Sequence, residues 1–191
     1  SGSLVEGDTL AVTGSISGRN AGSYDYVLNA DGITITNSNG DVESNYAITF
    51  VDGKLDIAKA NLTLKVNDQS DITYGDKINP GYTAETLLGS DTVSNVTFTV
   101  DGNDYNADTY YGNGNHTIAI KEYTVNDGNN GGNYNVTLES DGFSVAQRAI
   151  TITANSSSVT YNGADQSLTG GTITSGSLVD GDTLDVTGII S

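Results

Sequence analysis

The sequence has no cysteine, methionine or tryptophan, and Pro80 is the only proline among its 191 residues. Without cysteine the chain forms no disulfide and offers no thiolate to a metal ion, which excludes disulfide-stapled domains and thiolate zinc sites. Proline removes a backbone donor from a β-sheet, so its near absence leaves long stretches of this chain free to pair as strands.

Basic residues are also scarce, at seven against 24 acidic ones, which gives a formal net charge of −17. These seven do not cluster; they are Arg19, Lys54, Lys59, Lys65, Lys77, Lys121 and Arg148. Because an acidic surface repels phosphate groups, we expect no nucleic-acid partner and no binding to anionic membranes. No run approaches the roughly 20 apolar residues that span a membrane, so we expect no direct membrane insertion. Neither a signal peptide nor a terminal signal is visible, so we expect the chain to belong to a longer protein.

Apolar residues make up 36% of the chain, below the roughly 45–50% of typical globular domains, which predicts a thin core. Apolar and polar residues alternate in several short stretches, among them residues 24–28, 96–100, 116–120, 150–153 and 184–187. Asp-Gly and Asn-Gly pairs, which favour tight hairpin turns, punctuate the chain. This pattern predicts an all-β fold of Ig-like antiparallel β-sandwiches, with a single helical turn at residues 84–88.

An internal repeat is the strongest feature of the sequence. Residues 1–17 and 175–191 are identical at fourteen of seventeen positions, which sets a period of 174 residues. The sequence therefore predicts alternating, related modules of about 87 residues, half of that period. A weaker repeat with an offset of 88 supports this interpretation and relates residues 45–50 to 133–138 and residues 62–64 to 150–152.

On this period the chain contains one complete module, at residues 60–147. Residues 1–59 are then the C-terminal part of the preceding module, and residues 148–191 are the N-terminal part of the next. About three residues separate the last strand of one module from the first strand of the next, without a Gly/Ser-rich linker. Because short joints restrict hinge motion, we expect an elongated, semi-rigid rod. The two partial modules complement each other, so copies are also candidates for head-to-tail self-association.

Short motifs recur at matching places in these modules. They are Thr73-Tyr74-Gly75, Gly7-Asp8-Thr9, Asn45-Tyr46 and the closing Ala58-Lys59-Ala60. With them the chain resembles the MBG/YDG-type tandem repeats of bacterial surface adhesins, including filamentous-haemagglutinin-like proteins. Tyr161-Asn162-Gly163 occupies the same motif as Tyr74-Gly75-Asp76, whereas Ser90-Asp91-Thr92 replaces the Gly-Asp-Thr motif in the middle module. The resemblance implies an extracellular, cell-surface location, neighbouring repeats of the same protein as partners, and no catalytic residues.

One loop carries oxygen-bearing side chains of the kind that bind Ca²⁺: Asp101, Asp104, Asn106 and Asp108. Ca²⁺ takes about six to eight oxygen ligands. The loop has neither the EF-hand spacing nor the nine-residue glycine repeat of calcium β-rolls. Solvated turns are the alternative interpretation, because Asn, Asp and Gly are ordinary turn residues. Ca²⁺ is therefore a candidate ligand and not a required cofactor.

Three tyrosines beside this loop, Tyr105, Tyr110 and Tyr111, are candidates for stacking on sugar rings. The alternative is that tyrosine fills a thin core while its hydroxyl reaches the edge. The single histidine, His116, matches the strand position of Tyr24 and is predicted to be structural. No serine has the surroundings of a nucleophile elbow, so we expect the protein not to be an enzyme.

Two functions follow from these patterns. The first is a structural spacer of a bacterial extracellular adhesin or fibre, which projects an adhesive region or builds a surface or biofilm filament. The second is a ligand-binding adhesin module that holds Ca²⁺, glycan or a surface partner through its acidic and tyrosine-rich loops. Saturable binding of glycan or Ca²⁺ separates the second function from the first.

Overall fold

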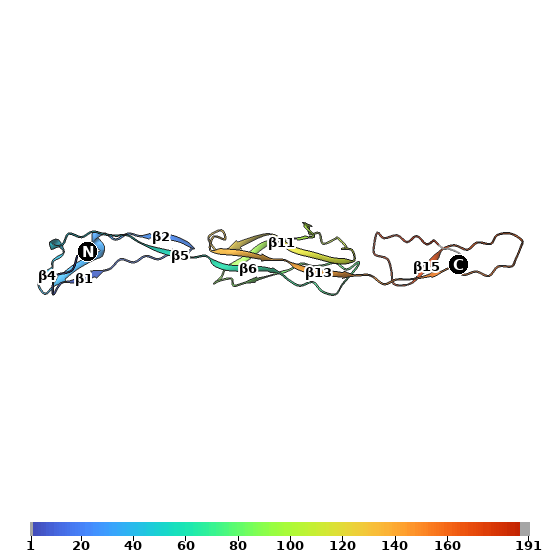
Figure 1. The fold of residues 1–191 in the computed structure, drawn as a ribbon, viewed down its shortest axis with the longest axis horizontal. Coiled ribbons are helices and arrows are strands. Elements are labelled where there is room, and N and C mark those ends of the chain that lie inside the picture. The colour runs from blue at the N-terminus through green and yellow to red at the C-terminus, as the bar shows by residue number, and fades with distance from the viewer. Residues whose placement is uncertain (1, 188–191) are drawn as a thin grey trace. The chain divides into compact units, whose positions relative to one another are not determined.

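The computed structural model describes residues 2–187, which are almost entirely β-structure, with 42% strand and 3% helix. In this part of the chain no helix is long and apolar enough to cross a membrane. The helical residues form two 3-10 turns, η1 (Ala30–Gly32) and η2 (Glu43–Asn45). The strands, several of which are labelled in Figure 1, are β1 (Thr9–Val12), β2 (Gly22–Tyr26), β3 (Ile33–Asn37), β4 (Gly40–Asp41), β5 (Gly53–Ile57), β6 (Ala60–Val66), β7 (Ile72–Thr73), β8 (Tyr82–Glu85), β9 (Thr92–Val100), β10 (Asn103–Asp104), β11 (Gly114–Asn126), β12 (Tyr134–Glu139), β13 (Asp141–Ala146), β14 (Thr151–Ala154) and β15 (Gly171–Ser175).

The described residues form two compact units. Unit 1 contains the residues up to Leu62 together with Thr86–Ser94 and Thr124–Thr137. Unit 2 contains Thr63–Glu85, Asn95–Tyr123 and the residues from Leu138 onward. Strands β6, β9, β11 and β12 contribute residues to both units. Below, residues 2–59, 60–147 and 148–187 are called the N-terminal, middle and C-terminal segments, after the predicted module boundaries.

The N-terminal segment, in unit 1, holds two small antiparallel sheets, β1-β3-β4 and β2-β5. In the first, Thr9 lies opposite Thr36 and Val12 opposite Ile33. In the second, Tyr24 lies opposite Leu55. Strand β3 alternates buried isoleucines with exposed threonines, as a strand with one solvated face should.

The strands of the middle segment belong to a five-stranded sheet, β10-β9-β11-β13-β7, and a three-stranded sheet, β12-β6-β8. Most pairings are antiparallel, whereas β13 and β7 are parallel. In β6 the alternation is complete, because Leu62, Leu64 and Val66 are each 0% exposed and the residues between them are not buried. This sandwich-like, all-β character is the one that the sequence predicted.

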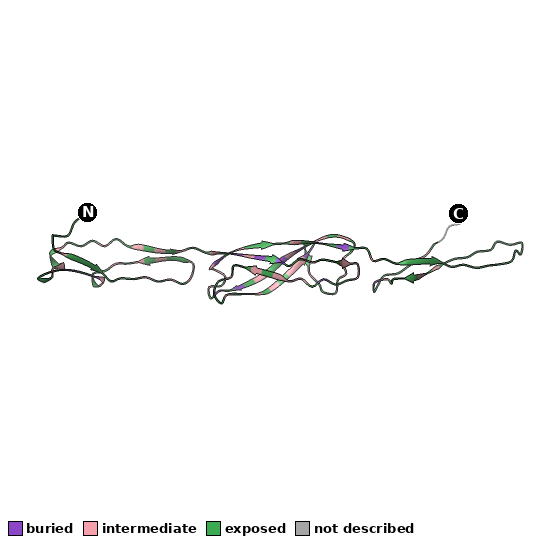
Figure 2. Ribbon diagram, turned by 90° about the horizontal axis from the view of Figure 1, so that it is seen from below, coloured by how far each residue is buried: buried purple, intermediate pink, exposed green. Residues whose placement is uncertain are grey.

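The core lies mainly in the middle segment. Eleven of the fourteen buried apolar side chains of the described chain belong to residues 60–147, and Figure 2 shows the buried positions concentrated in these strands. In the C-terminal segment, β14 and β15 form a two-stranded sheet and Val179 is the buried apolar residue among those described. Ile150 and Ile152, which correspond to Leu62 and Leu64 in the repeat, are 37% and 43% exposed. The same sequence position is therefore core in one segment and surface in the other.

Two local predictions were wrong. Residues 84–88 form no helical turn, because Ala84 and Glu85 belong to β8 and pair with β6. Long-range pairing thus overrides the weak helical preference of this stretch. Residues 184–187 form no strand, although the matching residues of β1 do. In the N-terminal segment, β1 pairs with β3.

Candidate functional sites

The four predicted Ca²⁺ ligands do not form a single site. Among residues 2–187, no three His, Cys, Asp or Glu side chains come together in a way that would hold a metal ion. Asn106 accepts a hydrogen bond from the backbone N–H of Asp108 at 2.8 Å, which is an ordinary Asx turn. Each carboxylate pairs instead with a different cationic or basic side chain: Asp101 with His116, Asp104 with Lys121, and Asp108 with Lys77.

The three tyrosines beside this loop are engaged within unit 2. The Tyr105 hydroxyl donates to the carbonyl oxygen of Ile78 at 2.7 Å. Lys77 Nζ lies 5.0 Å from the ring centroid of Tyr110, a cation–π distance. The ring of Tyr111 packs edge-on against Phe143, with centroids 5.8 Å apart. These contacts are those of tyrosines that help to hold the fold.

Tyr105 and Asp104 also line an open depression of about 440 Å³ in unit 2. Apolar walls come from Pro80 and Phe98, and Lys121 lies at the same depression. Two Asp104 oxygens accept hydrogen bonds from Lys121 Nζ at 2.7 and 2.9 Å. Asp104 and Lys121 thus satisfy each other, and Glu122 also lines the depression.

His116 lies on β11 opposite Phe143, and the two rings stack with centroids 5.2 Å apart. Tyr24 lies opposite Leu55, which corresponds to Phe143 in the repeat. His116 Nε2 is 2.8 Å from the carbonyl oxygen of Gly112, four residues earlier, and the Tyr24 hydroxyl donates in the same way to Asn20 at 2.8 Å. The predicted equivalence of His116 and Tyr24 is therefore confirmed, down to the hydrogen bond.

His116 differs from Tyr24 in having a second polar contact. Its Nδ1 lies 2.7 Å from Asp101 Oδ2, while Asp101 Oδ1 accepts from the backbone N–H of Thr117 at 2.9 Å. Both neighbours of the imidazole ring are acceptors, so the doubly protonated ring satisfies both. The hydrogen bond to Asp101, followed by that to Gly112, raises the pKa of His116 above its ordinary value. The same hydrogen bond, with that from Thr117, lowers the pKa of Asp101.

This pair predicts a stability that depends on pH. A raised His116 pKa contributes stability that is complete below about pH 6.5 and is lost as the pH rises through the folded-state pKa. A lowered Asp101 pKa contributes stability that is present above about pH 3.9 and is lost as the pH falls through its folded-state value. We therefore expect the free energy of unfolding to fall between pH 6 and pH 8, measured by urea denaturation.

The matched control for this prediction is His116→Tyr, which installs the residue that the N-terminal segment uses. The new hydroxyl keeps a donor for Gly112 and removes the group that titrates near neutrality. Its unfolding free energy should change less between pH 6 and pH 8 than that of the natural protein. Equal slopes in the two proteins would contradict the assignment.

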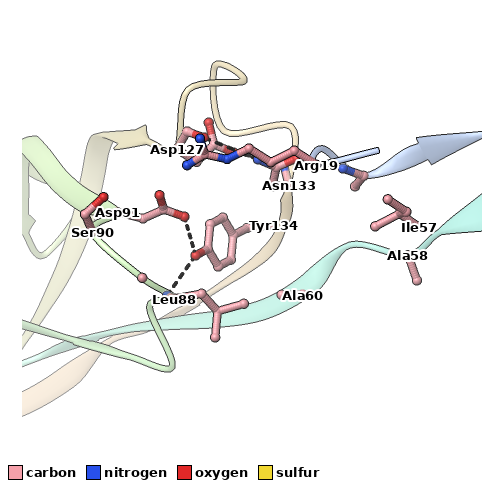
Figure 3. A pocket seen from close by; sticks show the side chains of 12 residues that line it. Arg19, Ile57, Ala58, Ala60, Leu88, Ser90, Asp91, Asp127, Asn133 and Tyr134 are labelled. Carbon is pink, nitrogen blue, oxygen red and sulfur yellow. Dashed lines mark hydrogen bonds between the residues drawn. The ribbon is translucent and has the colours of Figure 1, made fainter. Parts of the chain in front are cut away.

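A tyrosine–aspartate hydrogen bond recurs in unit 1 and is here called the clasp. In the N-terminal segment, Tyr46 donates to Asp8 Oδ2 at 2.5 Å and accepts from the backbone N–H of Val5 at 2.9 Å. In the middle segment, Tyr134 donates to Asp91 at 2.7 Å and accepts from Leu88 N at 2.9 Å. Figure 3 shows this second clasp as dashed lines. Both copies join the aspartate of the recurring Asp-Thr motif to the tyrosine of the Asn-Tyr motif.

The hydrogen bonds of the clasp shift the pKa values of Asp8, Tyr46 and Tyr134. The hydrogen bond from Tyr46, and then that from Asn37, lowers the pKa of Asp8. The hydrogen bond to Asp8 raises the pKa of Tyr46. Burial, followed by the hydrogen bond to Asp91, raises the pKa of Tyr134. Both tyrosines therefore stay protonated, and Asp8 stays ionised, through the neutral range.

The loop between β11 and β12 is organised by Asp127, the buried polar or charged side chain among the residues described, with 4% exposure. Its carboxylate accepts backbone hydrogen bonds from Asn129, Gly131 and Asn133 at 2.7 to 2.9 Å. Burial alone raises the pKa of Asp127, but these three hydrogen bonds outweigh it and leave the pKa below its ordinary value. A carboxylate held in this way fixes the backbone of the loop.

Asn133, at the end of this loop, joins it to the N-terminal segment. Its Oδ1 accepts from the backbone N–H of Ala21 at 2.8 Å, and its Nδ2 donates to Asn20 Oδ1 at 3.3 Å. Its backbone carbonyl accepts from Ala60 N at 2.8 Å, at the start of β6. Asn133 thus forms hydrogen bonds both with the start of β6 and with the residues just before β2.

A cavity of about 270 Å³ lies next to this joint within unit 1. Ala21, Ile57 and Leu88 form its apolar wall, and Tyr134 lines it beside Asp91. Arg19 lies at the rim beside the Asp127 loop, as Figure 3 shows. Asp91 and the Leu88 N–H already occupy the Tyr134 hydroxyl.

A second set of contacts, within unit 2, joins the middle and C-terminal segments. Arg148 Nε donates to the carbonyl oxygen of Tyr74 at 2.8 Å, and the Tyr74 hydroxyl donates to Asp182 at 3.1 Å. This hydrogen bond raises the pKa of Tyr74. Gly75 packs so closely that an added Cβ would lie 2.6 Å from Val179 Cγ2. The Tyr-Gly motif of the sequence is therefore a contact point between segments.

The residues that organise these joints carry no distinctive sequence pattern. Asp127 and Asn133 belong to a Gly- and Asn-rich stretch that resembles any solvated turn. The available signal for the clasp was that Asp8 and Tyr46 recur as Asp91 and Tyr134. Comparisons with protein-family models, with curated proteins and with solved structures found no match for this chain.

Proposed function

We propose that the chain is a structural spacer of a bacterial extracellular adhesin or fibre, in which tandem Ig-like modules form an elongated rod. The resemblance to MBG/YDG-type repeats and the 174-residue period support this proposal. Neighbouring repeats of the same protein are its partners, and ligand binding belongs elsewhere in the parent protein. The aspartates of the acidic loop pair with lysines, and the Tyr105 hydroxyl donates to the carbonyl oxygen of Ile78, which favours this role over that of a binding module.

The observation that carries the proposal is the joint at Asn133. Only Ala58 and Lys59 separate β5 from β6, so the connection has little conformational freedom. Side-chain and backbone hydrogen bonds of Asn133 hold residues on both sides of it. A spacer needs such joints, because a flexible linker would let successive modules fold back on each other.

Small-angle X-ray scattering of the full chain, at a dilution where it is monomeric, tests the rod. A compact domain of this length has a radius of gyration of roughly 16 Å. We expect a clearly larger value and a pair-distance distribution with a long tail. A value near that of a compact domain would contradict the proposal.

Ligand titration of the same full chain tests the spacer role independently of shape. We expect no saturable change in intrinsic tyrosine fluorescence with CaCl₂, with MgCl₂ as the matched control, and no saturable signal on a glycan array. Saturable, Ca²⁺-selective binding would assign the chain to the ligand-binding class instead.

A further inference from the structure

The last strand of the middle segment is held on both of its edges. Strand β13 pairs with β11 on one side and with β7 on the other, and Figure 1 labels β11 and β13. With β11 it shares five antiparallel register positions, in which Gly114 lies opposite Val145. Its apolar side chains Phe143 and Val145 are 4% and 2% exposed. To leave the fold, β13 must therefore break two rows of backbone contacts and expose two buried side chains.

The pairing of β13 with β7 is parallel, with Ile72 opposite Val145 and Thr73 opposite Ala146. When the middle segment is pulled by its two ends, β7 is drawn toward its N-terminal side and β13 toward its C-terminal side. Parallel strands that are drawn in this way slide past each other along their length. Because the hydrogen bonds of a parallel ladder are evenly spaced along the strands, they then carry the load together. Strands that are opened from one end break these bonds one at a time.

Two further hydrogen bonds extend this pair beyond β7. The backbone N–H of Tyr74 donates to the carbonyl oxygen of Ala146 at 2.9 Å. Arg148 Nε then donates to the carbonyl oxygen of Tyr74 at 2.8 Å. The connection therefore continues past the end of β7 and reaches the first residues after β13.

The Tyr-Gly motif closes β7 with a tight turn. The backbone N–H of Asp76 donates to the carbonyl oxygen of Thr73 at 2.8 Å, and Asp76 Oδ2 accepts from the backbone N–H of Thr73 at 2.9 Å. Gly75 has the positive φ, +97°, that position i+2 of a type II turn requires. Shortly after this turn, Ile78 is 4% exposed. For β7 to slide along β13, the closed turn and the buried Ile78 must move with it.

We infer that the middle segment bears tensile load, and that the parallel pair of β7 with β13 sets its resistance to unfolding under that load. This pair is here called the shear pair and consists of residues 72–74, residues 145–146 and Arg148, all within unit 2. Bearing load goes beyond spacing, because a spacer keeps two parts apart whereas the shear pair keeps the module folded while it is stretched. The inference takes from the proposed function only the source of the load.

Single-molecule pulling of the full chain tests the shear pair, and the absence of cysteine allows handles at chosen positions. Ser70→Cys with Gln147→Cys, both at exposed positions, loads β7 and β13 along their length. Asn113→Cys with Gln147→Cys is the matched geometry, because Asn113 precedes Gly114, which lies opposite Val145, so this pull opens β11 and β13 from one end. At equal force, the first geometry should unfold at least about tenfold more slowly, since several hydrogen bonds must break together. Equal rates in the two geometries would overturn the inference.

Two substitutions of Tyr74 separate its backbone link from its side chain. Tyr74→Pro and Tyr74→Ala both lose the ring and the hydroxyl, and only proline also lacks the N–H that donates to Ala146. Proline is favoured at position i+1 of a type II turn, and Thr73 is already in a strand, as suits a residue before proline. With handles at residues 70 and 147, Tyr74→Pro should unfold roughly three- to tenfold faster than Tyr74→Ala at the same force. Equal rates would contradict the role of the shear pair.

The opening geometry is the control for the same two variants. With handles at residues 113 and 147 the hydrogen bonds break in turn, so the two variants should unfold at rates within about twofold of each other. A difference as large as that under shear would show that Tyr74→Pro weakens the whole fold, and it would overturn the assignment. The comparison of the two geometries with tyrosine at position 74 needs neither variant to fold, so the inference stays falsifiable.

Failure of this inference and failure of the proposed spacer give different results. A compact scattering profile with unfolding rates that depend on geometry rejects the rod and retains the shear pair. An extended profile with equal rates in both geometries rejects the shear pair and retains the rod.

Discussion

Leu64→Ala is expected to lower the free energy of unfolding by about 2–5 kcal/mol, the usual cost of emptying a leucine site in a packed core. Leu64 is 0% exposed on the central strand of β12-β6-β8, between Leu62 and Val66, which are also fully buried. The hydrophobic content of the chain is low, so few other side chains are available to fill the space. Urea denaturation followed by circular dichroism measures the change.

The repeat supplies a matched control for this substitution. Ile152→Ala removes a branched aliphatic side chain at the corresponding position of β14, where 43% of the residue is exposed. Its cost should stay below about 1 kcal/mol in the monomer, because little burial is lost. Similar losses at Leu64 and Ile152 would show that the two segments share one core, contrary to the burial pattern.

Gly75→Ala is expected to disrupt the contact between the middle and C-terminal segments. Gly75 has a φ of +97°, which side chains other than glycine adopt at a cost of about 1–3 kcal/mol. In addition, the new Cβ would lie 2.6 Å from Val179 Cγ2 and 2.9 Å from Arg148 Nη2. The arginine end can move aside, but Val179 is only 7% exposed and has little space. Methyl NMR shifts of Val179 report the displacement.

Gly163→Ala separates backbone strain from the steric clash. Gly163 has a φ of +77°, but its nearest neighbour to an added Cβ is the Tyr161 hydroxyl at 4.0 Å. This variant should carry the backbone strain without the steric clash, and it should leave the Val179 methyl shifts unchanged. If both variants move Val179, or neither does, the close contact at Gly75 is not what holds this valine.

The sequence predicted the all-β class because alternation of polar and apolar residues is a local property that strand burial preserves. It predicted the equivalence of His116 and Tyr24 for a similar reason, since both face the same partner position on the neighbouring strand. The prediction of a helical turn at residues 84–88 was wrong because β8 pairs with β6, whose residues lie about 20 positions earlier in the sequence.

Residues 184–187 show the limit of local reasoning most clearly. Their sequence nearly repeats that of β1, yet only the N-terminal copy is a strand. A strand is stabilised by hydrogen bonds to a neighbouring strand, and β1 pairs with β3. Among these four residues the copies differ only in that Asp185 stands where β1 has Ala11, and aspartate is depleted in strands. This single change favours a strand in the N-terminal copy, but a local pattern does not show what either copy pairs with.

The acidic loop shows a different limit of the sequence. Oxygen-rich composition is shared by cation sites and by turns, and the sequence does not show which carboxylate meets which base. Lys77 and Lys121 each take one aspartate, and both are distant from the loop in sequence. Asp127 was overlooked because its three backbone donors lie within six residues and leave no pattern beyond Asn and Gly.

The short range of the Asp127 hydrogen bonds also bears on the order of folding. They close loops of two to six residues, whereas the contacts of Asn133 with Asn20 and Ala21 span 113 and 112 residues. Closing a loop of about ten residues takes on the order of 10–100 ns, and longer closures cost more entropy. We therefore expect this loop to form early and independently of the N-terminal segment. The residues around Asn20 and Ala21 in the N-terminal segment then pack late in folding, against a loop that has already formed.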